Sequence, residues 1–213
     1  MGADTVYGRR AVFLDRDGVI NRNVLNPATG ELEAPLTAAE FEVLPGVSKG
    51  LRQLQAAGYL LFVVSNQPNY AKGKSTLREL RAVDGAMRDA LDAMRVWMAA
   101  VYYCLHHPEG GVQGYTGPCA CRKPAPYFLF KAAREYGIDL SQSWMVGDRA
   151  TDVACGRAAG VRTILVGESA ENLKADWVGR DLAEAARHIL DEMLAPQLSV
   201  GSAQGSVGMA THK

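Results

Sequence analysis

Residues 11–18 read AVFLDRDG, an apolar run that ends abruptly in two aspartates, an arginine and a glycine. Ala11 to Leu14 has the composition of a strand that is buried on both faces, as the strands of a parallel sheet are. Asp15 and Asp17 follow two positions apart, so both side chains can flank the same point above the edge of the sheet. This stretch therefore predicts a central strand with a carboxylate pair at its end.

The rest of the chain alternates apolar runs with segments whose apolar residues recur at helical spacing. This alternation predicts an α/β fold in which a parallel sheet is covered by helices on both faces. The expected strands are Ala11–Leu14, Tyr59–Val64, Ala99–Tyr103, Trp144–Val146 and Arg162–Val166, and the expected helices are Gly46–Ala57, Leu77–Met94, Tyr127–Tyr136, Ala150–Ala159 and Leu182–Leu194.

The composition is ordinary for a soluble globular protein, with 48% hydrophobic and 22% charged residues among 213. Basic and acidic residues both number 23, so the formal net charge is zero. This balance argues against a general nucleic-acid or membrane-surface binder. Because the sequence has no long apolar segment and no secretory signal, we expect a cytoplasmic protein with no nucleic-acid or membrane partner.

The length indicates one domain, which we expect to span residues 1–195. Residues 21–45 form a connection too long for an ordinary loop, so we expect a flap or hairpin over the site. The Gly/Ser-rich segment 196–213 has little periodic apolar content, and we expect it to be a disordered tail.

Three of the expected strands end in a carboxylate or a hydroxyl: Asp15, Ser65 and Asp148. Ligands bind at the carboxyl ends of parallel strands, so these residues are expected to share one site. Of two close carboxylates, one can attack phosphorus while the other carries a proton to the leaving group. Magnesium, which prefers hard oxygen ligands, would offset the negative charge of the nucleophile and the phosphate.

Three further segments could complete such a site. Ser65 and Asn66 offer a hydroxyl and an amide to phosphate oxygens, and Lys123 could neutralise the nucleophile and the phosphate. Asp148 could complete a magnesium site, while Asp152, one helical turn on, could orient Lys123. Each segment taken alone is equally an ordinary polar turn or a helix-capping aspartate, and only their combination favours a catalytic site.

Together the segments resemble the four motifs of the haloacid dehalogenase superfamily, in the same order. This resemblance implies a Rossmann-like fold and a phosphatase in which Asp15 is the nucleophile and Asp17 the general acid and base. It also implies magnesium held by the Asp15 carboxylate, the Asp17 backbone carbonyl and the Asp148 carboxylate. The matching segments are FLDRDGVIN with Asp15 and Asp17, VVSNQ with Ser65, RKP with Lys123, and VGDRATD with Asp148 and Asp152.

Three of the four cysteines lie within eighteen residues and form, with a histidine, a CxH…CxC set across a glycine-rich loop. Cys104, His106, Cys119 and Cys121 would close a tetrahedral zinc shell with no open position, which is typical of a structural site. His107 is the alternative to His106, but the CxH spacing lets both side chains point the same way. Cys155 is expected to be a small buried side chain.

The zinc loop, residues 104–121, ends directly before Arg122 and Lys123, so a metal there would fix both cations over the phosphate site. CLHHPEG and CACRKP resemble the D-glycero-D-manno-heptose 1,7-bisphosphate phosphatases, with histidinol-phosphate phosphatases next, from about Arg10 to Leu190. This resemblance implies the four zinc ligands above, a substrate-binding Arg122, no large cap domain, and a cytoplasmic monomer that acts on a phosphorylated sugar. The predicted substrate- and phosphate-binding residues are Asn21, Ser65, Asn66, Gln67, Arg122 and Lys123, with Arg149 and Asp152 in support.

The sequence departs from this family's pattern in the segments expected to line the pocket. Residues 21–45 are longer than usual and lack a Gly-Tyr pair, the second motif reads SNQPNYAKGKS, and Arg149 stands where lysine is frequent. The sequence is therefore compatible with three candidate functions. The first is removal of the C7 phosphate of a heptose bisphosphate, for lipopolysaccharide or nucleotide-heptose synthesis. The second is a phosphatase for histidinol phosphate or another small sugar phosphate, and the third is a non-catalytic zinc-stabilised binding protein.

Overall fold

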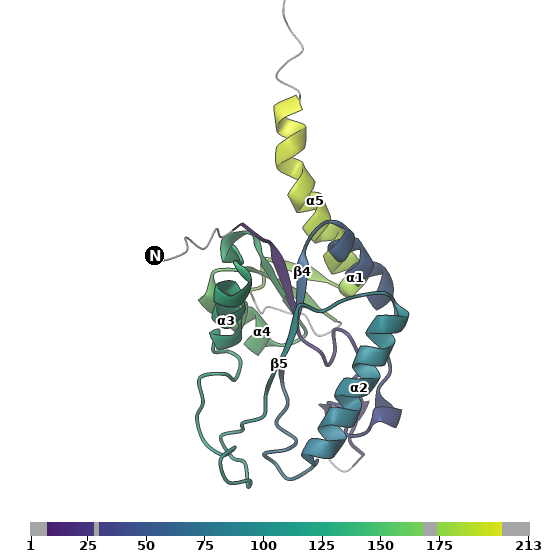
Figure 1. Ribbon diagram of the computed structural model, residues 1–213, viewed down its shortest axis with the longest axis vertical. Helices are drawn as coiled ribbons and strands as arrows, with labels where there is room; N and C mark the ends of the chain where they lie inside the picture. The colour runs from purple at the N-terminus through teal and green to yellow at the C-terminus, as the bar shows by residue number, and fades with distance from the viewer. Residues whose placement is uncertain (1–7, 28–29, 168–173, 202–213) are drawn as a thin grey trace, which may run out of the picture.

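The computed structural model describes residues 8–27, 30–167 and 174–201, and its centre is a six-stranded parallel sheet (Figure 1). The strand order is β5-β4-β1-β6-β7-β8, which places β1 in the interior between β4 and β6. The strands are β1 Ala11–Leu14, β4 Leu60–Asn66, β5 Ala100–Cys104, β6 Trp144–Gly147, β7 Arg162–Val166 and β8 Trp177–Gly179.

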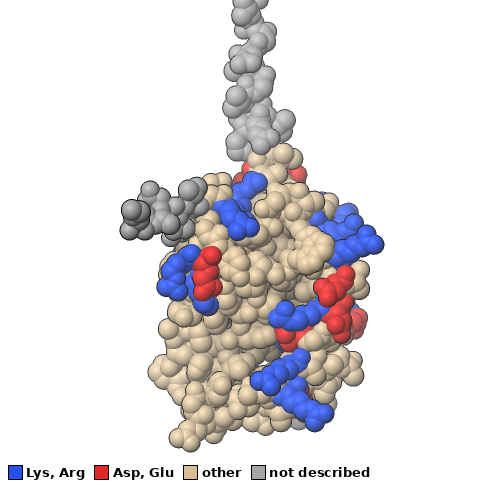
Figure 2. Space-filling view, in the orientation of Figure 1, with Lys and Arg blue, Asp and Glu red and all other residues tan. Residues whose placement is uncertain are grey.

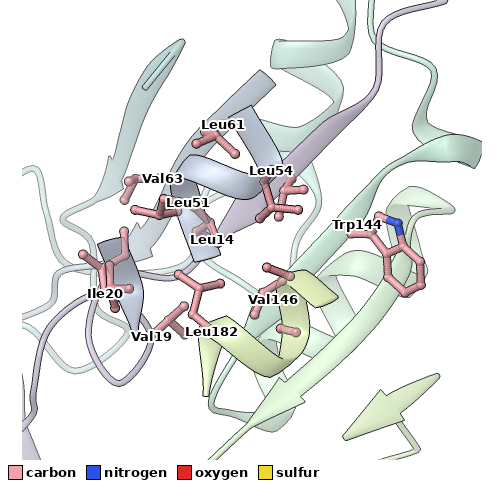
Figure 3. Close-up of a cluster of buried hydrophobic side chains, with 14 of the residues drawn as sticks. Leu14, Val19, Ile20, Leu51, Leu54, Leu61, Val63, Trp144, Val146 and Leu182 are labelled. Carbon is pink, nitrogen blue, oxygen red and sulfur yellow. The ribbon is translucent and has the colours of Figure 1, made fainter. Parts of the chain in front are cut away.

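Helices cover both faces of this sheet, and the alternation of side chains along β1 shows why. Val12 and Leu14 enter one core together with residues of α1, α2 and α5, whereas Ala11 and Phe13 enter a second core with α3 and α4. Figure 3 shows part of the first core, where Leu182 of α5 faces the sheet. The helices are α1 Val47–Ala56, α2 Leu77–Ala93, α3 Tyr127–Tyr136, α4 Ala150–Ala159 and α5 Leu182–Gly201, with short 3-10 turns at Ala38–Glu40 and Leu140–Gln142.

This arrangement confirms the predicted α/β fold with a parallel sheet covered on both faces. The flap region contains a small antiparallel hairpin, β2 Val24–Leu25 and β3 Leu32–Glu33. β8 was not predicted, because three residues are too few to show a pattern. Figure 2 shows basic and acidic side chains in small groups over one face, several of them of mixed sign.

The C-terminal helix is longer than predicted. α5 continues to Gly201, through Pro196 and into the first six residues of the segment expected to be disordered, and Figure 1 shows it extending beyond the sheet. The Gly/Ser-rich composition and the weak apolar periodicity of segment 196–213 are the reasons why the sequence suggested an end there. The rest of that segment, 202–213, lies outside the described residues. Among the described helices, none is long and apolar enough to cross a membrane.

Candidate active site

The predicted carboxylates meet at the carboxyl ends of β1 and β6, which are neighbours in the sheet. The Asp15 N–H donates to the Val146 carbonyl at 2.9 Å, which fixes the loop after β1 beside the loop after β6. A cavity of about 330 Å³ opens there, and its lining includes Asp15, Asp17 and Lys123. These segments, far apart in sequence, therefore share one pocket, as expected for a parallel sheet, in which ligands bind at the carboxyl ends of the strands.

Lys123 lies between two carboxylates under this pocket. Its Nζ is 3.0 Å from Asp15 Oδ1 and 2.6 Å from Asp152 Oδ1, and it donates to the Val64 carbonyl at 2.7 Å. Burial alone would lower the pKa of Lys123, but the charges of Asp15 and Asp152 outweigh it and raise the pKa. The lysine is therefore a fixed cation that neutralises the predicted nucleophile.

Asp152 performs both of the roles that the sequence left open. Its Oδ2 accepts the Arg149 N–H at 3.0 Å and so caps α4, while its other oxygen pairs with Lys123. Gly147 makes room for it, because a Cβ at that position would lie 2.1 Å from the Asp152 Cβ. Burial, with the charge of Asp15 adding to it and Lys123 opposing it, raises the pKa of Asp152 to about 6.

Asp148 faces the same spot from the end of β6. Oxygens of Asp15, Asp148 and Asp152 lie within 4.8 Å of one another, and Asp148 Oδ1 is buried without a hydrogen-bond partner among the described residues. Asn23 donates to the other oxygen at 3.3 Å, and Gly18 leaves the space that this carboxylate occupies. A buried acceptor that lacks a hydrogen bond and lies among clustered carboxylates fits a hard divalent cation such as Mg²⁺.

Magnesium binding is predicted to strengthen as pH rises towards neutrality. Burial, followed by the charges of Asp15 and Asp152, raises the pKa of Asp148 to about 7, so the metal-free protein holds a proton there below that pH. Binding must release this proton, so affinity should rise up to about tenfold per pH unit below 7 and then level off. Calorimetry with MgCl₂ between pH 5.5 and 8.5 measures this, and a flat affinity over that range would contradict it.

The same shift bears on stability without metal. A carboxyl whose folded pKa lies above its unfolded value stabilises the fold at low pH, and that contribution disappears as pH rises through the folded pKa. The metal-free protein should therefore lose stability between about pH 4 and pH 7 on account of Asp148, and added Mg²⁺ should restore it above pH 7.

Asp17 is held by three side chains that the sequence did not assign to this task. Arg16 donates to its carboxylate from Nε and Nη2 at 2.9 to 3.2 Å, Asn21 at 3.0 Å and Gln67 at 2.6 Å. Arg16 is 1% exposed and also lies over the ring of Tyr103. Asn21 and Gln67, which the sequence predicts to contact the substrate, both donate to this carboxylate and so help to fix its orientation.

The other residues predicted from the second motif are placed around the end of β4. Ser65 is buried and accepts a hydrogen bond from Gln67 at 3.1 Å. Asn66 lines the pocket, but its amide group bridges the backbone N–H and carbonyl of Lys123 at 3.0 and 3.1 Å. Asn66 thus holds the lysine segment against β4, a role in addition to the predicted phosphate contact.

The predicted zinc ligands converge into one compact group. The sulfurs of Cys104, Cys119 and Cys121 lie 3.2 to 3.6 Å apart, and His106 Nδ1 is 3.5 Å from Cys121 Sγ and 3.8 Å from Cys104 Sγ. Zinc–sulfur bonds of about 2.3 Å in a tetrahedron place the sulfurs ~3.8 Å apart, so the group fits a zinc ion. His107 lies outside it and accepts the Glu109 N–H.

Comparison with known proteins agrees with this geometry. Residues 120–192 match the HAD-hydrolase-like family. The chain is 38% identical over 181 residues to D-glycero-beta-D-manno-heptose-1,7-bisphosphate 7-phosphatase of Salmonella typhi, covering 82% of this chain and 92% of that protein. The same enzyme of Escherichia coli K12 is 37% identical over 186 residues, with 84% and 93% covered. The chain belongs to this phosphatase family.

Solved structures of the family share the fold. The D,D-heptose 1,7-bisphosphate phosphatase of B. bronchiseptica, complexed with magnesium and phosphate, superposes with a TM-score of 0.72 at 30% identity. The superposition covers 86% of this chain and 99% of that one. The corresponding enzyme of Burkholderia thailandensis gives 0.59 at 26% identity, with 85% and 99% covered. This member of the family is accordingly a phosphoric monoester hydrolase of the haloacid dehalogenase type.

Three cationic side chains lie around the mouth of the pocket in this member of the family: Lys72, Arg122 and Arg149. Arg122 donates from Nη1 to the carbonyl of His106 at 3.1 Å, so the loop of residues 104–121 helps to set its position. Arg149 is 3.8 Å from Asp148 and otherwise exposed, and Lys72 was not predicted. Residues 31–34, which include β3 of the hairpin, also line the pocket.

Proposed function

We propose that the protein removes the C7 phosphate of D-glycero-D-manno-heptose 1,7-bisphosphate through an aspartyl-phosphate on Asp15. One observation carries the proposal: Asp15 and Lys123 line one pocket and form an ion pair, and an Asp148 carboxylate oxygen lies within 4.8 Å of the Asp15 carboxylate. The cations around the mouth of that pocket suit a substrate with a second phosphate. The relatives' names supply the sugar, which the geometry alone would not specify.

The chemistry assigned to these residues runs in two displacements. An Asp15 oxygen attacks phosphorus as the bond to the sugar oxygen breaks, and Asp17 gives that oxygen a proton. Asp17, now a carboxylate, then takes a proton from a water that attacks phosphorus, which releases phosphate and restores Asp15. Lys123 offsets negative charge in both steps, and Mg²⁺, held by the Asp15 and Asp148 carboxylates and the Asp17 carbonyl, would supply further charge neutralisation.

A substrate panel tests the proposed function. We expect kcat/KM to be highest for a heptose 1,7-bisphosphate, with the α and β anomers compared separately, and at least about tenfold lower for histidinol phosphate and for sugar monophosphates. A higher value for histidinol phosphate would instead favour the second candidate. No hydrolysis of any phosphate ester by the magnesium-loaded protein would favour a binding protein.

We also propose a structural zinc ion in the group formed by Cys104, His106, Cys119 and Cys121. Burial raises the pKa of the Cys104 thiol, so without a cation this cysteine would stay protonated in the group. Elemental analysis of the purified protein should find about one zinc per chain, and Cys121→Ser should lower that content strongly. Cys155→Ser is the matched control, because Cys155 is buried elsewhere and donates to the Ala125 carbonyl. A zinc-free wild-type protein would contradict the assignment.

A further inference from the structure

The β2–β3 hairpin forms a wall of the active-site pocket but has little packing of its own. Each of its strands is two residues long, and a hairpin of this size is not stable in isolation. Leu25 of β2 pairs with Leu32 of β3, and both residues are 60% exposed, so this apolar pair buries little surface. Contacts with the rest of the protein must therefore fix the position of this wall.

An ion pair between Glu33 and Lys74 joins β3 to the loop after β4. Lys74 Nζ lies 2.6 Å from Glu33 Oε1, and Asn26 on the hairpin donates to the same oxygen at 3.1 Å. The Glu33 side chain is only 15% exposed, although it lies at the mouth of a pocket. The hydrogen bond from Lys74 is the main cause that lowers the pKa of Glu33, so the carboxylate stays charged at neutral pH.

The loop that carries Lys74 is itself firmly held. The Lys74 N–H donates to the Asn69 carbonyl at 2.9 Å and the Lys72 N–H to the Pro68 carbonyl at 2.9 Å. The Ala71 carbonyl accepts from the Gly111 N–H of the zinc loop at 2.7 Å, so the zinc loop also holds the loop after β4 in place. Pro68, Asn69 and Lys72 line the pocket, so the ion pair joins one wall to the other.

We propose that the Glu33–Lys74 ion pair fixes the β2–β3 hairpin at a set distance from the loop after β4 and thereby determines which sugar the pocket accepts. Both partners lie in the two segments where the sequence departs from the family pattern. The pair is thus a specificity-determining contact of this chain, and neither residue takes part in the chemistry. The inference rests on the proposed function for the identity of the sugar.

A charge-swap cycle tests the proposal. Glu33→Gln and Lys74→Met should each raise KM for the preferred heptose bisphosphate about two- to fivefold with little change in kcat, the scale of a partly exposed ion pair. Glu33→Lys should raise KM at least as much, because it places two lysines together. Combining Glu33→Lys with Lys74→Glu should return KM to within about twofold of the wild type.

Hydrogen exchange gives a readout that does not depend on turnover. The Asn26 N–H donates across the hairpin to the Glu31 carbonyl at 2.8 Å and should exchange faster in each single variant. It should exchange more slowly in the swap than in Glu33→Lys alone, because the swap restores the ion pair but not the acceptor for the Asn26 side chain. Glu192→Gln, which removes the distant ion pair with Arg162, is the control and should change neither KM nor this exchange.

Two kinetic results would overturn the proposal while the proposed function stands. One is a lower KM with Glu33→Gln and a higher KM with Lys74→Met. Changes of KM in opposite directions would mean that only the net charge at the mouth of the pocket affects substrate binding. The other is a swap variant no better than the single variants. If the wild type instead hydrolyses no heptose bisphosphate, the proposed function fails, and unchanged exchange in the single variants would separately refute the ion pair's role.

Discussion

Asp15→Asn should lower kcat by about 10⁴-fold or more, the scale on which enzymes lose rate when a covalent nucleophile is removed. The amide has nearly the shape of the carboxylate but cannot attack phosphorus. Lys123 keeps its contact with Asp152 in this variant, so the fold should persist, with a stability change within about 2 kcal/mol. Phosphate release under saturating Mg²⁺ measures the first effect, and a urea titration measures the second.

Asp89→Asn is a suitable control, because Asp89 lies on the exposed side of α2 and the same change of charge should leave kcat unaltered. Mass spectrometry of acid-quenched wild-type enzyme should show a phosphorylated peptide that contains Asp15 and is missing from the variant. Undiminished turnover by Asp15→Asn would disprove the covalent mechanism, whatever the substrate.

Lys123→Met should have the largest effect on stability. The lysine is 3% exposed and separates two buried carboxylates, so its loss leaves Asp15 and Asp152 facing each other without a cation. Removing one partner of a buried charge pair costs about 3–5 kcal/mol. Activity should fall at least about 10³-fold, because the nucleophile and the phosphate lose the same cation.

The loss should depend on pH with a definite sign. Without Lys123, the pKa of Asp152, already raised to about 6 by burial, should rise further, so the variant folds best when this carboxyl is protonated. Its stability relative to wild type should therefore be better at pH 5.5 than at pH 8, as urea midpoints at both pH values can measure. Lys131→Met, on the surface of α3, should change the midpoint little at either pH. A variant as stable as wild type at pH 8 would contradict this account.

The parts of the site that could be predicted from sequence are those that follow from topology. Asp15 and Asp148 end apolar runs, and parallel strands bring such ends to one edge, so their meeting needs no knowledge of side-chain contacts. The cysteine group could likewise be predicted, because short spacings within one loop restrict where the side chains can point.

The parts that could not be predicted depend on side-chain direction and on partners far away in the sequence. Arg16 lies between two aspartates in a loop, and charged residues are seldom fully buried, so nothing in the sequence indicates that it turns inward and lies over the ring of Tyr103. The inward direction of Gln67 depends on that arginine. Glu33, in β3, and Lys74, in the loop after β4, are 41 positions apart, and no local pattern links them.

The hydrogen bond from Arg122 to the His106 carbonyl has a thermodynamic consequence. It connects a predicted zinc ligand with a side chain at the mouth of the pocket, so zinc and a bound phosphate ester both favour the same arrangement of the loop. Coupling between two binding equilibria is reciprocal: if zinc tightens the binding of the ester, the ester must tighten the binding of zinc by the same factor. An enzyme supplied with substrate should therefore withstand chelators better than an idle one.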